Sequence, residues 1–568
     1  MNCCQEISHS RLRAILIASL VSLAFLLGWI SLTSAGDPAG GATGNINDVA
    51  AVTPGAPTFI ELANQVGHDK IGLNFVWTLI AGFLVFFMQA GFALVETGFT
   101  RAKNAAHTMA MNLMVFLVGA VGYYLVGFAF QFGGVMSVAN LGGAGALDRE
   151  FSPGGFGLIG LKGFGLTGDT YDVGIFALFL FQMVFMDTAA TIPTGAMAER
   201  VKFLAVVIST LSISMVLYPI FGNWVWGGGW LSQLGAKFGL GHGVVDFAGS
   251  GVVHMIGGMA ALAGAIVLGP RTGKYRADGT PVAMPGHNIP LAILGTIILF
   301  FGWFGFNPGS TLAGGDLRIS IVAVNTMMAG AVSGLVAMVY MWLKFGKPDP
   351  AMTCNGALAG LVAITAPCAF INAASAVIIG AVAGVLVCAG AFFIERKLKI
   401  DDPVGAIAVH GLNGLWGIIS LGIFADGTYG AGWNGVGSSV YQGIAGRGVA
   451  GLLYGDPGQF IAQVVGAGVA IIWGLGFSYI FFKVLDAIMG IRTSEEDELA
   501  GLDIPEMGVP AYPDFLMPPV IGELSGGGGG KTGAASTEPA WKPSPGAAGV
   551  AGATGAVGAT GAIGTAES

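Results

Sequence analysis

The chain has 568 residues, of which 54% are hydrophobic and only 10% are charged. This composition excludes an ordinary soluble protein and indicates a membrane protein with many spans. The formal net charge of −8 argues little about partners, because the apolar runs carry almost no charge, and no nucleic acid is expected.

The first apolar run extends from Ile15 to Leu32 and follows Arg11 and Arg13. Small residues at Thr33 to Ala35 offer the positions that a signal peptidase prefers, so residues 1–35 are predicted to be a signal peptide, with an additional helix as the alternative. Residues 36–70 are polar and rich in Gly, Ala and Pro, which predicts an exposed leader.

Eleven apolar spans follow and define a membrane domain over residues 71–490. Their approximate cores are residues 72–97, 107–132, 174–198, 202–225, 246–269, 288–306, 319–343, 354–371, 375–394, 403–425 and 459–488. The 96 glycines suit helices that approach closely in lipid. The fold class expected is therefore an all-α polytopic membrane protein with eleven transmembrane helices.

Lys and Arg are concentrated in every second connection between the spans. The rich connections hold Arg101, Lys103, Arg200, Lys202, Arg271, Lys274, Arg276, Lys344, Lys347, Arg396, Lys397, Lys399 and Arg492. The positive-inside rule makes these connections cytoplasmic. We therefore expect a multi-pass protein of the cell (inner) membrane with its N-terminus outside and its C-terminus in the cytoplasm.

An aspartate followed eight residues later by a histidine occurs twice, as Asp246 with His254 and as Asp402 with His410. If both stretches are helical, each histidine lies about 12 Å from its aspartate and so near the membrane midplane. A lone histidine there is most simply a packing residue, but two at matched depth favour a conduction path.

The two Asp-His stretches open spans 5 and 10, which are the last spans of the two halves. Five is an odd number, so spans 1–5 and 6–10 insert with opposite orientation, which predicts two inverted five-helix repeats plus one C-terminal helix. The two histidines then converge from opposite halves on a central transport site.

The C-terminal part divides into two segments. Residues 491–524 are polar and are expected to be ordered against the cytoplasmic face, whereas residues 525–568 are rich in Gly, Ala and Thr. Glycine recurs at every third position from Gly546 to Gly564, which is the collagen period, but no proline follows Pro545. Such a composition cannot bury a core, so disorder is predicted for this tail.

Several motifs share a fixed order along the spans. They are Gly91 to Gly98 with Arg101 to Asn104, Gly195 to Arg200, Trp226 to Gly229, Asp246 to His254, Gly302 to Ser310, Asp401 to Pro403 and Val409 to Gly411. Each is weak alone, but together they closely resemble the ammonium transporter family (Amt/Mep/Rh), of bacterial Amt type, over roughly residues 70–515. That resemblance implies a homotrimer in which each subunit has its own pore.

The resemblance also implies roles for particular residues. Phe181, Trp226 and Ser310 would form an outer ammonium-binding site supported by Asp246. Below it, Phe185 and Phe306 would form a stacked gate above a pore lined by His254 and His410. Aromatic faces attract small cations, a hydroxyl oxygen accepts hydrogen bonds from them, and neutral imidazoles both donate and accept protons.

Simpler roles exist for some of these side chains. The chain has 37 phenylalanines, so each of these phenylalanines taken alone would be interpreted as a packing residue. Trp226 taken alone would be interpreted as a residue of the membrane interface. A carboxylate at the start of a helix stabilises that helix. Asp402 is therefore interpreted as a cap, and Asp246 as both a cap and a support for the outer site.

The function expected is ammonium transport, in which NH4+ loses its proton and NH3 crosses a hydrophobic pore with associated proton transfer. The alternatives are a passive ammonia gas channel and an ammonium sensor or transceptor. An enzyme is not expected, because no nucleophile and base set accompanies the histidines. No cofactor or metal is expected either, because the five cysteines, Cys3, Cys4, Cys354, Cys368 and Cys388, have no metal-ligand spacing.

Two features depart from the family pattern. The tail keeps Gly501 to Asp503 and Ala511-Tyr512, but Met507-Gly508-Val509 replaces the expected His-Gly-Glu, so a P-II type signalling protein is only one option as a partner. Asp187 lies inside the third span, where small uncharged residues are expected. It is interpreted either as a neutral acid bonded to Thr188 or Thr191, or as a proton-relay or regulatory residue.

Overall fold

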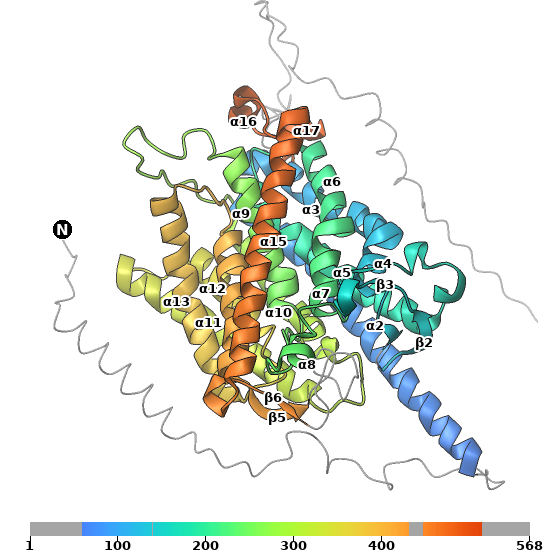
Figure 1. Ribbon diagram of the computed structural model, residues 1–568. Coiled ribbons are helices and arrows are strands. Elements are labelled where there is room, and N and C mark those ends of the chain that lie inside the picture. Colours follow the sequence, from blue (N-terminus) through green and yellow to red (C-terminus); the bar gives the residue numbers. More distant parts are fainter. Residues whose placement is uncertain (1–58, 139, 431–446, 514–568) are drawn as a thin grey trace, which may run out of the picture.

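The computed structural model describes residues 59–138, 140–430 and 447–513. They form a bundle whose long helices run between two ends (Figure 1). The end that carries α16 (Glu495–Ala500) and α17 (Asp503–Met507) is called here the Asp402 end, and the opposite end, with α8 (Leu234–Phe238), the Trp226 end. The predicted signal peptide, most of the leader and the tail 525–568 lie outside the described residues.

The helices follow the predicted spans closely. In the first half they are α2 (Phe59–Phe99), α3 (Ala105–Gly122), α4 (Phe128–Phe132), α5 (Val173–Met197), α6 (Phe203–Ser212), α7 (Tyr218–Val225) and α9 (Ile256–Leu268). In the second half they are α10 (Ile289–Phe306), α11 (Ile319–Phe345), α12 (Pro350–Ile364), α13 (Ala373–Phe393), α14 (Asn413–Phe424) and α15 (Pro457–Met489). α2 begins at Phe59, so the leader predicted to reach residue 70 ends earlier.

Short π-helical and 3-10 segments join or extend several of these helices. The ones that matter for the site are the π-helical η8 (Ser250–Met255) before α9, the 3-10 helix η9 (Pro308–Thr311) after α10, and the π-helical η11 (Ile407–Leu412) before α14. Similar π-helical turns lengthen α3, α6 and α13, namely η3 (Tyr123–Gly127), η7 (Ile213–Leu217) and η10 (Ile394–Leu398).

Polar side chains fix where many helices begin. The Asp172 carboxylate accepts hydrogen bonds from Gly174 N and Ile175 N at the start of α5, and Asp349 does the same for α12. Asp456 caps α15, whose first residue is Pro457. These carboxylates satisfy N–H groups that have no partner within the helix, and a proline at the first position loses no hydrogen bond there.

Ten helices in the described ranges are long and apolar enough to cross a membrane. The eighth predicted span corresponds to α12, which has 15 residues and so rises only about 22 Å, less than a hydrocarbon core of about 30 Å. The helical membrane fold is thus confirmed, whereas eleven crossings and the inverted repeats stay predictions.

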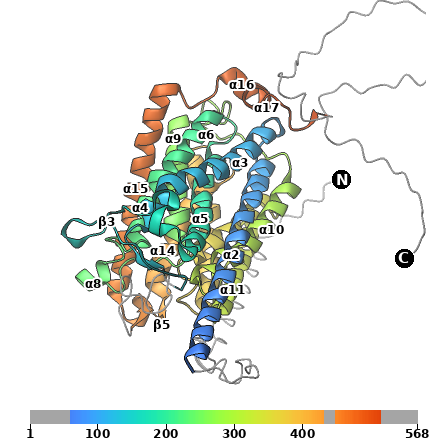
Figure 2. The same cartoon turned by 90° about the vertical axis from the view of Figure 1, so that its right-hand side faces the viewer.

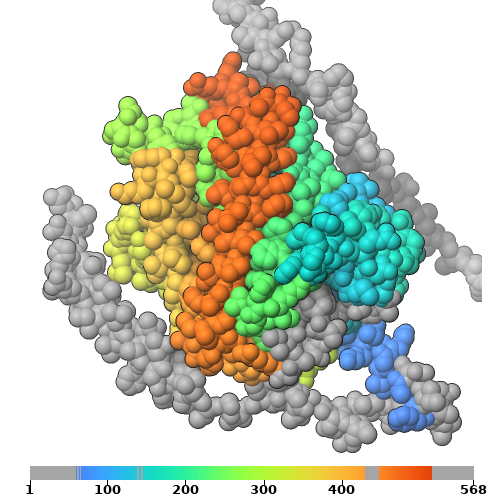
Figure 3. Space-filling view, in the orientation of Figure 1, coloured from blue at the N-terminus to red at the C-terminus, as the bar shows by residue number. Residues whose placement is uncertain are grey.

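Burial separates inner helices from outer ones. In their most apolar stretches, 72% of the α5 residues and 83% of those in η8 and α9 are buried, against 33% for α2 and α15. α15 crosses the surface of the bundle in Figure 3, and its Ile472, Ile480 and Ile488 are exposed. Apolar side chains exposed in this way suit contact with lipid.

Glycines allow the close contact between α2 and α10, which lie side by side in Figure 2. A Cβ added at Gly295 of α10 would lie 2.6 Å from Gly91 O, and one added at Gly98 of α2 would lie 2.6 Å from Ala292 N. Neither position has room for a larger residue, as expected for helices that approach closely in lipid.

Three small antiparallel sheets accompany the helices. β1 (Met136–Val138) pairs with β2 (Gly142–Leu147), β3 (Glu150–Phe151) with β4 (Ile159–Gly160), and β5 (Asp426–Gly430) with β6 (Gly448–Ala450). They lie in connections and not in the spans, so the all-α prediction holds for the spans of the membrane domain and not for its connections.

Candidate functional site

Two buried histidines meet at the centre of the bundle. Nδ1 of His254, on η8, lies 3.2 Å from Nδ1 of His410, on η11, and the ring centroids are 5.2 Å apart. One ring must donate through N–H while the other accepts through a lone pair, so the pair cannot hold two imidazolium ions in this arrangement. The predicted convergence of the two Asp-His stretches is confirmed.

The backbone before each histidine differs from the prediction. Residues 246–249 are not helical, and η8 begins only at Ser250 with Gly249 in the left-handed region at φ 111°. His254 therefore does not stand on eight continuous residues of α-helix above Asp246. Both histidines lie on six-residue π-helical segments, a local distortion that is common at functional sites and that side-chain patterns do not reveal.

The two aspartates cap these segments in the same way. The Asp246 carboxylate accepts hydrogen bonds from Gly249 N, Gly251 N and Val252 N at 2.8–2.9 Å. The Asp402 carboxylate also accepts from three backbone N–H groups of the second stretch, Gly405 N, Ala406 N and Ile407 N, at 2.7–3.1 Å. The spacing Asp-x7-His is thus the spacing of a cap and the π-helical segment that it starts.

Asp246 is fully enclosed although it lies outside the helix. Burial raises the pKa of its carboxyl to about 6, and the hydrogen bonds from the backbone N–H groups oppose that rise. Burial also raises the pKa of Asp402, against the same kind of backbone hydrogen bonds. The charge on Asp246 is therefore sensitive to pH in the weakly acidic range.

Aromatic rings connect the histidines to the Trp226 end. Phe181 lies 4.6 Å from Phe185, Phe185 stacks on Phe306 at 4.0 Å, and Phe306 stacks on His254 at 5.4 Å, all measured between ring centroids. The three phenylalanines come from α5 and α10 and are buried. The two residues predicted as a gate therefore do form a stacked pair directly above the histidines.

Trp226 and Ser310 lie beside this column. The Trp226 ring is 6.2 Å from Phe185 at an angle of 74°, and its Nε1–H donates to Asp246 O at 2.6 Å. Ser310 Oγ, on η9, donates to Phe306 O at the end of α10 at 2.8 Å. All eight predicted site residues are thus joined by direct contacts, and the main chain of Asp246 orients the tryptophan.

Two further aromatic residues touch the histidines. Trp303 stacks on His254 at 5.2 Å, and its Nε1–H donates to Thr365 Oγ1 at 2.9 Å. Phe92 lies 6.0 Å from His410 on the other side of the pair. Trp303 could have been found from its spacing of three residues before Phe306 on one helix. Phe92 lies in the motif Gly91 to Gly98, which is the signal that could have found it.

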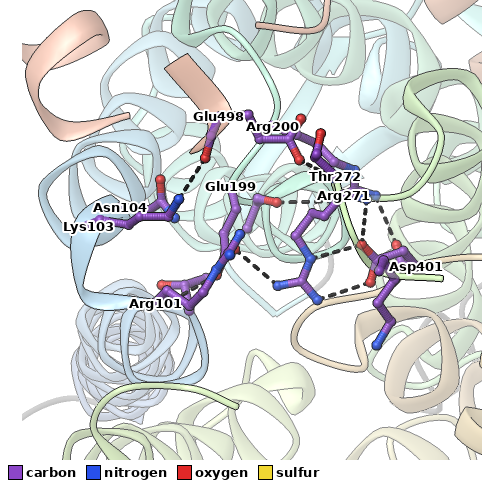
Figure 4. A network of polar contacts seen from close by, with 12 residues as sticks. Arg101, Lys103, Asn104, Glu199, Arg200, Arg271, Thr272, Asp401 and Glu498 are labelled. Atoms are coloured by element: carbon purple, nitrogen blue, oxygen red, sulfur yellow. Dashed lines mark hydrogen bonds and ion pairs between the residues drawn. The ribbon is translucent and has the colours of Figure 1, made fainter. Parts of the chain in front are cut away.

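An extensive ion-pair cluster closes the Asp402 end (Figure 4). Arg271 donates from Nε and Nη2 to the Asp401 carboxylate at 2.8 and 3.0 Å, and it also pairs with Glu199, as Arg101 does. Burial opposes ionisation of Asp401, but the hydrogen bonds and charge of Arg271 hold its pKa at about 2. The cluster fixes the connection that leads to Asp402 and η11.

The profile of the Ammonium Transporter Family matches residues 76–512. The chain is 49% identical over 451 residues to "Ammonium transporter Amt2" of Archaeoglobus fulgidus, covering 79% of this chain and 90% of the relative. The chain belongs to the ammonium transporter family. Its members are transporters and not enzymes, and this chain is a multi-pass membrane protein.

Other members of the ammonium transporter family are similar in sequence and in structure. "Putative ammonium transporter sll1017" of Synechocystis is 37% identical, covering 78% of this chain and 90% of that protein. The solved structure titled "Sensor Amt Protein" has a TM-score of 0.67 and 37% identity over 78% of this chain and 99% of its own. The crystal structure of Candida albicans Mep2 has a TM-score of 0.62 and 29% sequence identity, covering 79% of this chain and 92% of that chain.

The C-terminal region of this family member packs on the Asp402 end as far as the structure describes it. The Asp503 carboxylate accepts from His107 N and Ala511 N, and the Tyr512 hydroxyl lies 2.7 Å from His287 Nε2. Asp503 and Tyr512, which belong to the two parts of the tail motif that this sequence keeps, therefore hold the tail in place. Met507 ends α17 between them.

Asp187 does not have the partners that were expected. Thr188 Oγ1 donates to Val184 O, and Thr191 Oγ1 donates to Gln89 Oε1. Asp187 is only 3% exposed, and its Oδ1 has no hydrogen-bond partner among the described residues. The prediction of a neutral acid bonded to a neighbouring threonine is wrong.

Proposed function

We propose that this protein transports ammonium by binding NH4+ at the Trp226 end, removing its proton and passing NH3 along the histidine pair. The observation that supports this most is the unbroken series of contacts from Phe181 through the stacked gate to His254 and His410. It joins a group of aromatic rings suited to a cation with a pair of rings suited to a neutral molecule.

The aromatic site at the Trp226 end suits a cation, whereas the histidine pair suits a neutral molecule. Aromatic faces attract a desolvated cation by about 2 kcal/mol, and the Ser310 oxygen can accept a hydrogen bond from it. Moving a full charge into the buried centre costs of order 20 kcal/mol by idealised Born estimates. NH3 avoids most of that cost, and the imidazoles can hydrogen-bond with it. Potassium has no proton to lose, so it would be rejected at the centre.

The membrane arrangement that we propose places the Trp226 end outside and the Asp402 end in the cytoplasm, consistent with the charge of the connections. With α12 as an additional crossing, eleven spans form two inverted five-helix repeats and a last helix, α15. The matching caps at Asp246 and Asp402 support this symmetry. We also propose a homotrimer, a cleaved signal peptide and a P-II type signalling protein as a partner at the cytoplasmic face.

Two alternatives have support of their own. A passive ammonia gas channel fits the apolar gate and the neutral histidine pair. An ammonium sensor is suggested by the similarity to the structure titled "Sensor Amt Protein". Both differ from transport with proton transfer in a measurable way, because neither a gas channel nor a pure sensor moves net charge with ammonium.

The experiment that tests the proposal is current measurement on solid-supported membranes carrying the purified protein. Ammonium pulses should give currents that saturate with concentration, and potassium pulses should not. Ammonia flux without current would establish the gas channel, and the absence of both, with ammonium still binding, would favour the sensor.

A further inference from the structure

A buried polar seam lies beside the histidine lumen, between α2, α3 and α5. It begins on α5, where Asp187, Thr191 and Thr194 lie within about 60° of one another around the helix, while Phe185 points about 200° away from Asp187. Thr191 Oγ1 donates to Gln89 Oε1 of α2 at 3.0 Å, and Thr194 Oγ1 contacts the carboxylate of Glu96, also of α2. This face of α5 therefore faces α2 and not the lumen.

The seam continues through α3. Gln89 Nε2 donates to Asn112 O, and Asn112 Nδ2 donates to Glu96 Oε2 at 2.9 Å. Glu96 and Asp187 are each only 3% exposed, and Asn112 is fully buried. Oδ1 of Asn112 and Oδ1 of Asp187 have no hydrogen-bond partner among the described residues. Buried polar atoms of this kind are the usual partners of internal water molecules.

Burying an acidic side chain in an apolar span costs free energy, so such residues usually have a function or a cationic partner. No ion pair in the described part of the chain includes Asp187 or Glu96. The charged group that acts on Glu96 is Asp402, which has the same sign, and the polar neighbours of Glu96 on α3 and α5 are Asn112 and Thr194. If these two side chains only formed hydrogen bonds between helices, uncharged amide or hydroxyl side chains would do so equally well.

One end of the seam lies near the gate and the other near the connection that starts at Asp402. Asp187 is two residues from Phe185, the gate ring, and so lies about 3 Å further along the helix axis. Glu96 lies one turn along α2 from Phe92, whose ring is 6.0 Å from His410. A Cβ added at Gly195 would clash with Val404 and lie 3.3 Å from Glu96 Oε1, so Glu96 is next to the connection that starts at Asp402.

A cavity of about 410 Å³ opens at the same end and is lined in part by Phe99, Asp402 and Val404. Phe99 is one helical turn from Glu96 on α2. The seam thus extends from the level of the gate over about 10 Å of α5 between Asp187 and Thr194, and its Glu96 end lies one helical turn from the cavity lining.

We propose that this seam is a proton path, separate from the lumen, in which Asp187 and Glu96 alternate between acid and carboxylate. The inference rests on the proposed transport of ammonium. Asp187 passes its proton through Thr191, Thr194 and bound water to Glu96, which releases one to the cavity at the Asp402 end. A water then carries the proton of NH4+ to the Asp187 carboxylate. The N–H bonding pair stays on nitrogen, NH3 crosses the lumen and takes up a proton on leaving, so each cycle moves one charge.

The test uses full-length protein in proteoliposomes with two readouts: current on a solid-supported membrane, and ammonia flux followed by a pH dye inside the vesicles. The variants are Asp187→Asn and Glu96→Gln, which keep size and hydrogen bonding. The matched control is Asp169→Asn, because Asp169 pairs with Lys162 at the surface and lies outside both the seam and the cavity. Both seam variants should lose ammonium current by about tenfold or more, as expected when a proton-transfer group is removed, while ammonia flux persists.

Each other outcome has a definite meaning. Unchanged current in both variants would overturn the proton path and leave the proposed transport intact. Loss of current and flux together in correctly assembled variants would also overturn it, since that result indicates packing. If the wild-type protein gives neither current nor flux, the proposed function itself fails; flux without current in the wild type would reject the path and leave a gas channel.

Infrared difference spectroscopy provides a second readout. Adding ammonium to the wild-type protein should change the carbonyl stretch of protonated carboxylic acids, and Asp187→Asn and Glu96→Gln should each remove part of that change. A merely structural role for the acids predicts the same difference spectrum in the wild-type protein and both variants, which would contradict the proposal.

Discussion

Replacing Asp246 by asparagine, with Asp402→Asn as a matched control, separates helix capping from support of the ammonium site. Each carboxylate accepts three backbone N–H groups at the start of a π-helical segment that carries a histidine. Only Asp246 lies next to the proposed binding site, where its main-chain oxygen accepts the Nε1–H of Trp226 at 2.6 Å. Both variants therefore weaken a helix cap, but only Asp246→Asn also changes the charge next to the proposed ammonium site.

The shared defect can be estimated from the hydrogen bonds. An asparagine keeps one acceptor oxygen, and its NH2 group must face at least one of the three N–H donors. A hydrogen bond to a charged acceptor contributes about 1.5 to 3 kcal/mol, and a buried N–H left unpaired costs a similar amount. We expect each variant to lose about 2 to 4 kcal/mol of stability, seen as a lower midpoint of thermal unfolding in detergent.

The difference should appear in the ammonium dependence of the current. Asp246→Asn should raise the half-saturating ammonium concentration, because it removes a negative charge near the bound cation, whereas Asp402→Asn should not. The pKa of Asp246 is raised to about 6 by burial, so the wild-type carboxylate is ionised above that pH and protonated below it. The half-saturating concentration of the wild type should therefore rise as the pH falls through about 6, and that of Asp246→Asn should not.

Titrations of the purified protein with ammonium at several pH values on either side of 6 would measure this. An equal shift in both variants would refute the reasoning, since it would mean that capping alone accounts for Asp246. A wild-type half-saturating concentration that does not change with pH would refute the role of its charge.

Three further predictions concern the same structure. His254→Ala or His410→Ala should abolish selective ammonium conduction while size-exclusion chromatography still shows an assembled protein, and unaltered selectivity and rate in both would contradict the central claim. Trp226→Leu should raise the half-saturating ammonium concentration by removing a cation-binding ring, with an unchanged value counting against that role. Because Arg271 lowers the pKa of Asp401 to about 2, the stability from this pair is present above the ordinary value of 3.8 and is lost as pH falls towards 2. Asp401→Asn should remove about 2 to 3 kcal/mol of it, and acid unfolding that matches the wild type would contradict the assignment.

The sequence alone determined the membrane class, the approximate spans and the pairing of the two Asp-His stretches. Long apolar runs have few alternatives in lipid, where only helices satisfy the backbone, so hydropathy is informative there. The family motifs then identified the stacked Phe185 and Phe306, the Trp226 ring and the two histidines. These residues were predictable because each lies in a short motif whose spacing the helices preserve.

The tertiary structure decided what depends on backbone distortion and on contacts between distant segments. Periodicity assumes regular helix, so it placed His254 on an α-helix that in fact begins at Ser250 and is locally π-helical. Local sequence also suggested threonine partners for Asp187, but those hydroxyls donate to Val184 O and to Gln89. Gln89 is 98 residues away from Asp187 in the chain, and only helix packing brings α2, α3 and α5 together around the acid.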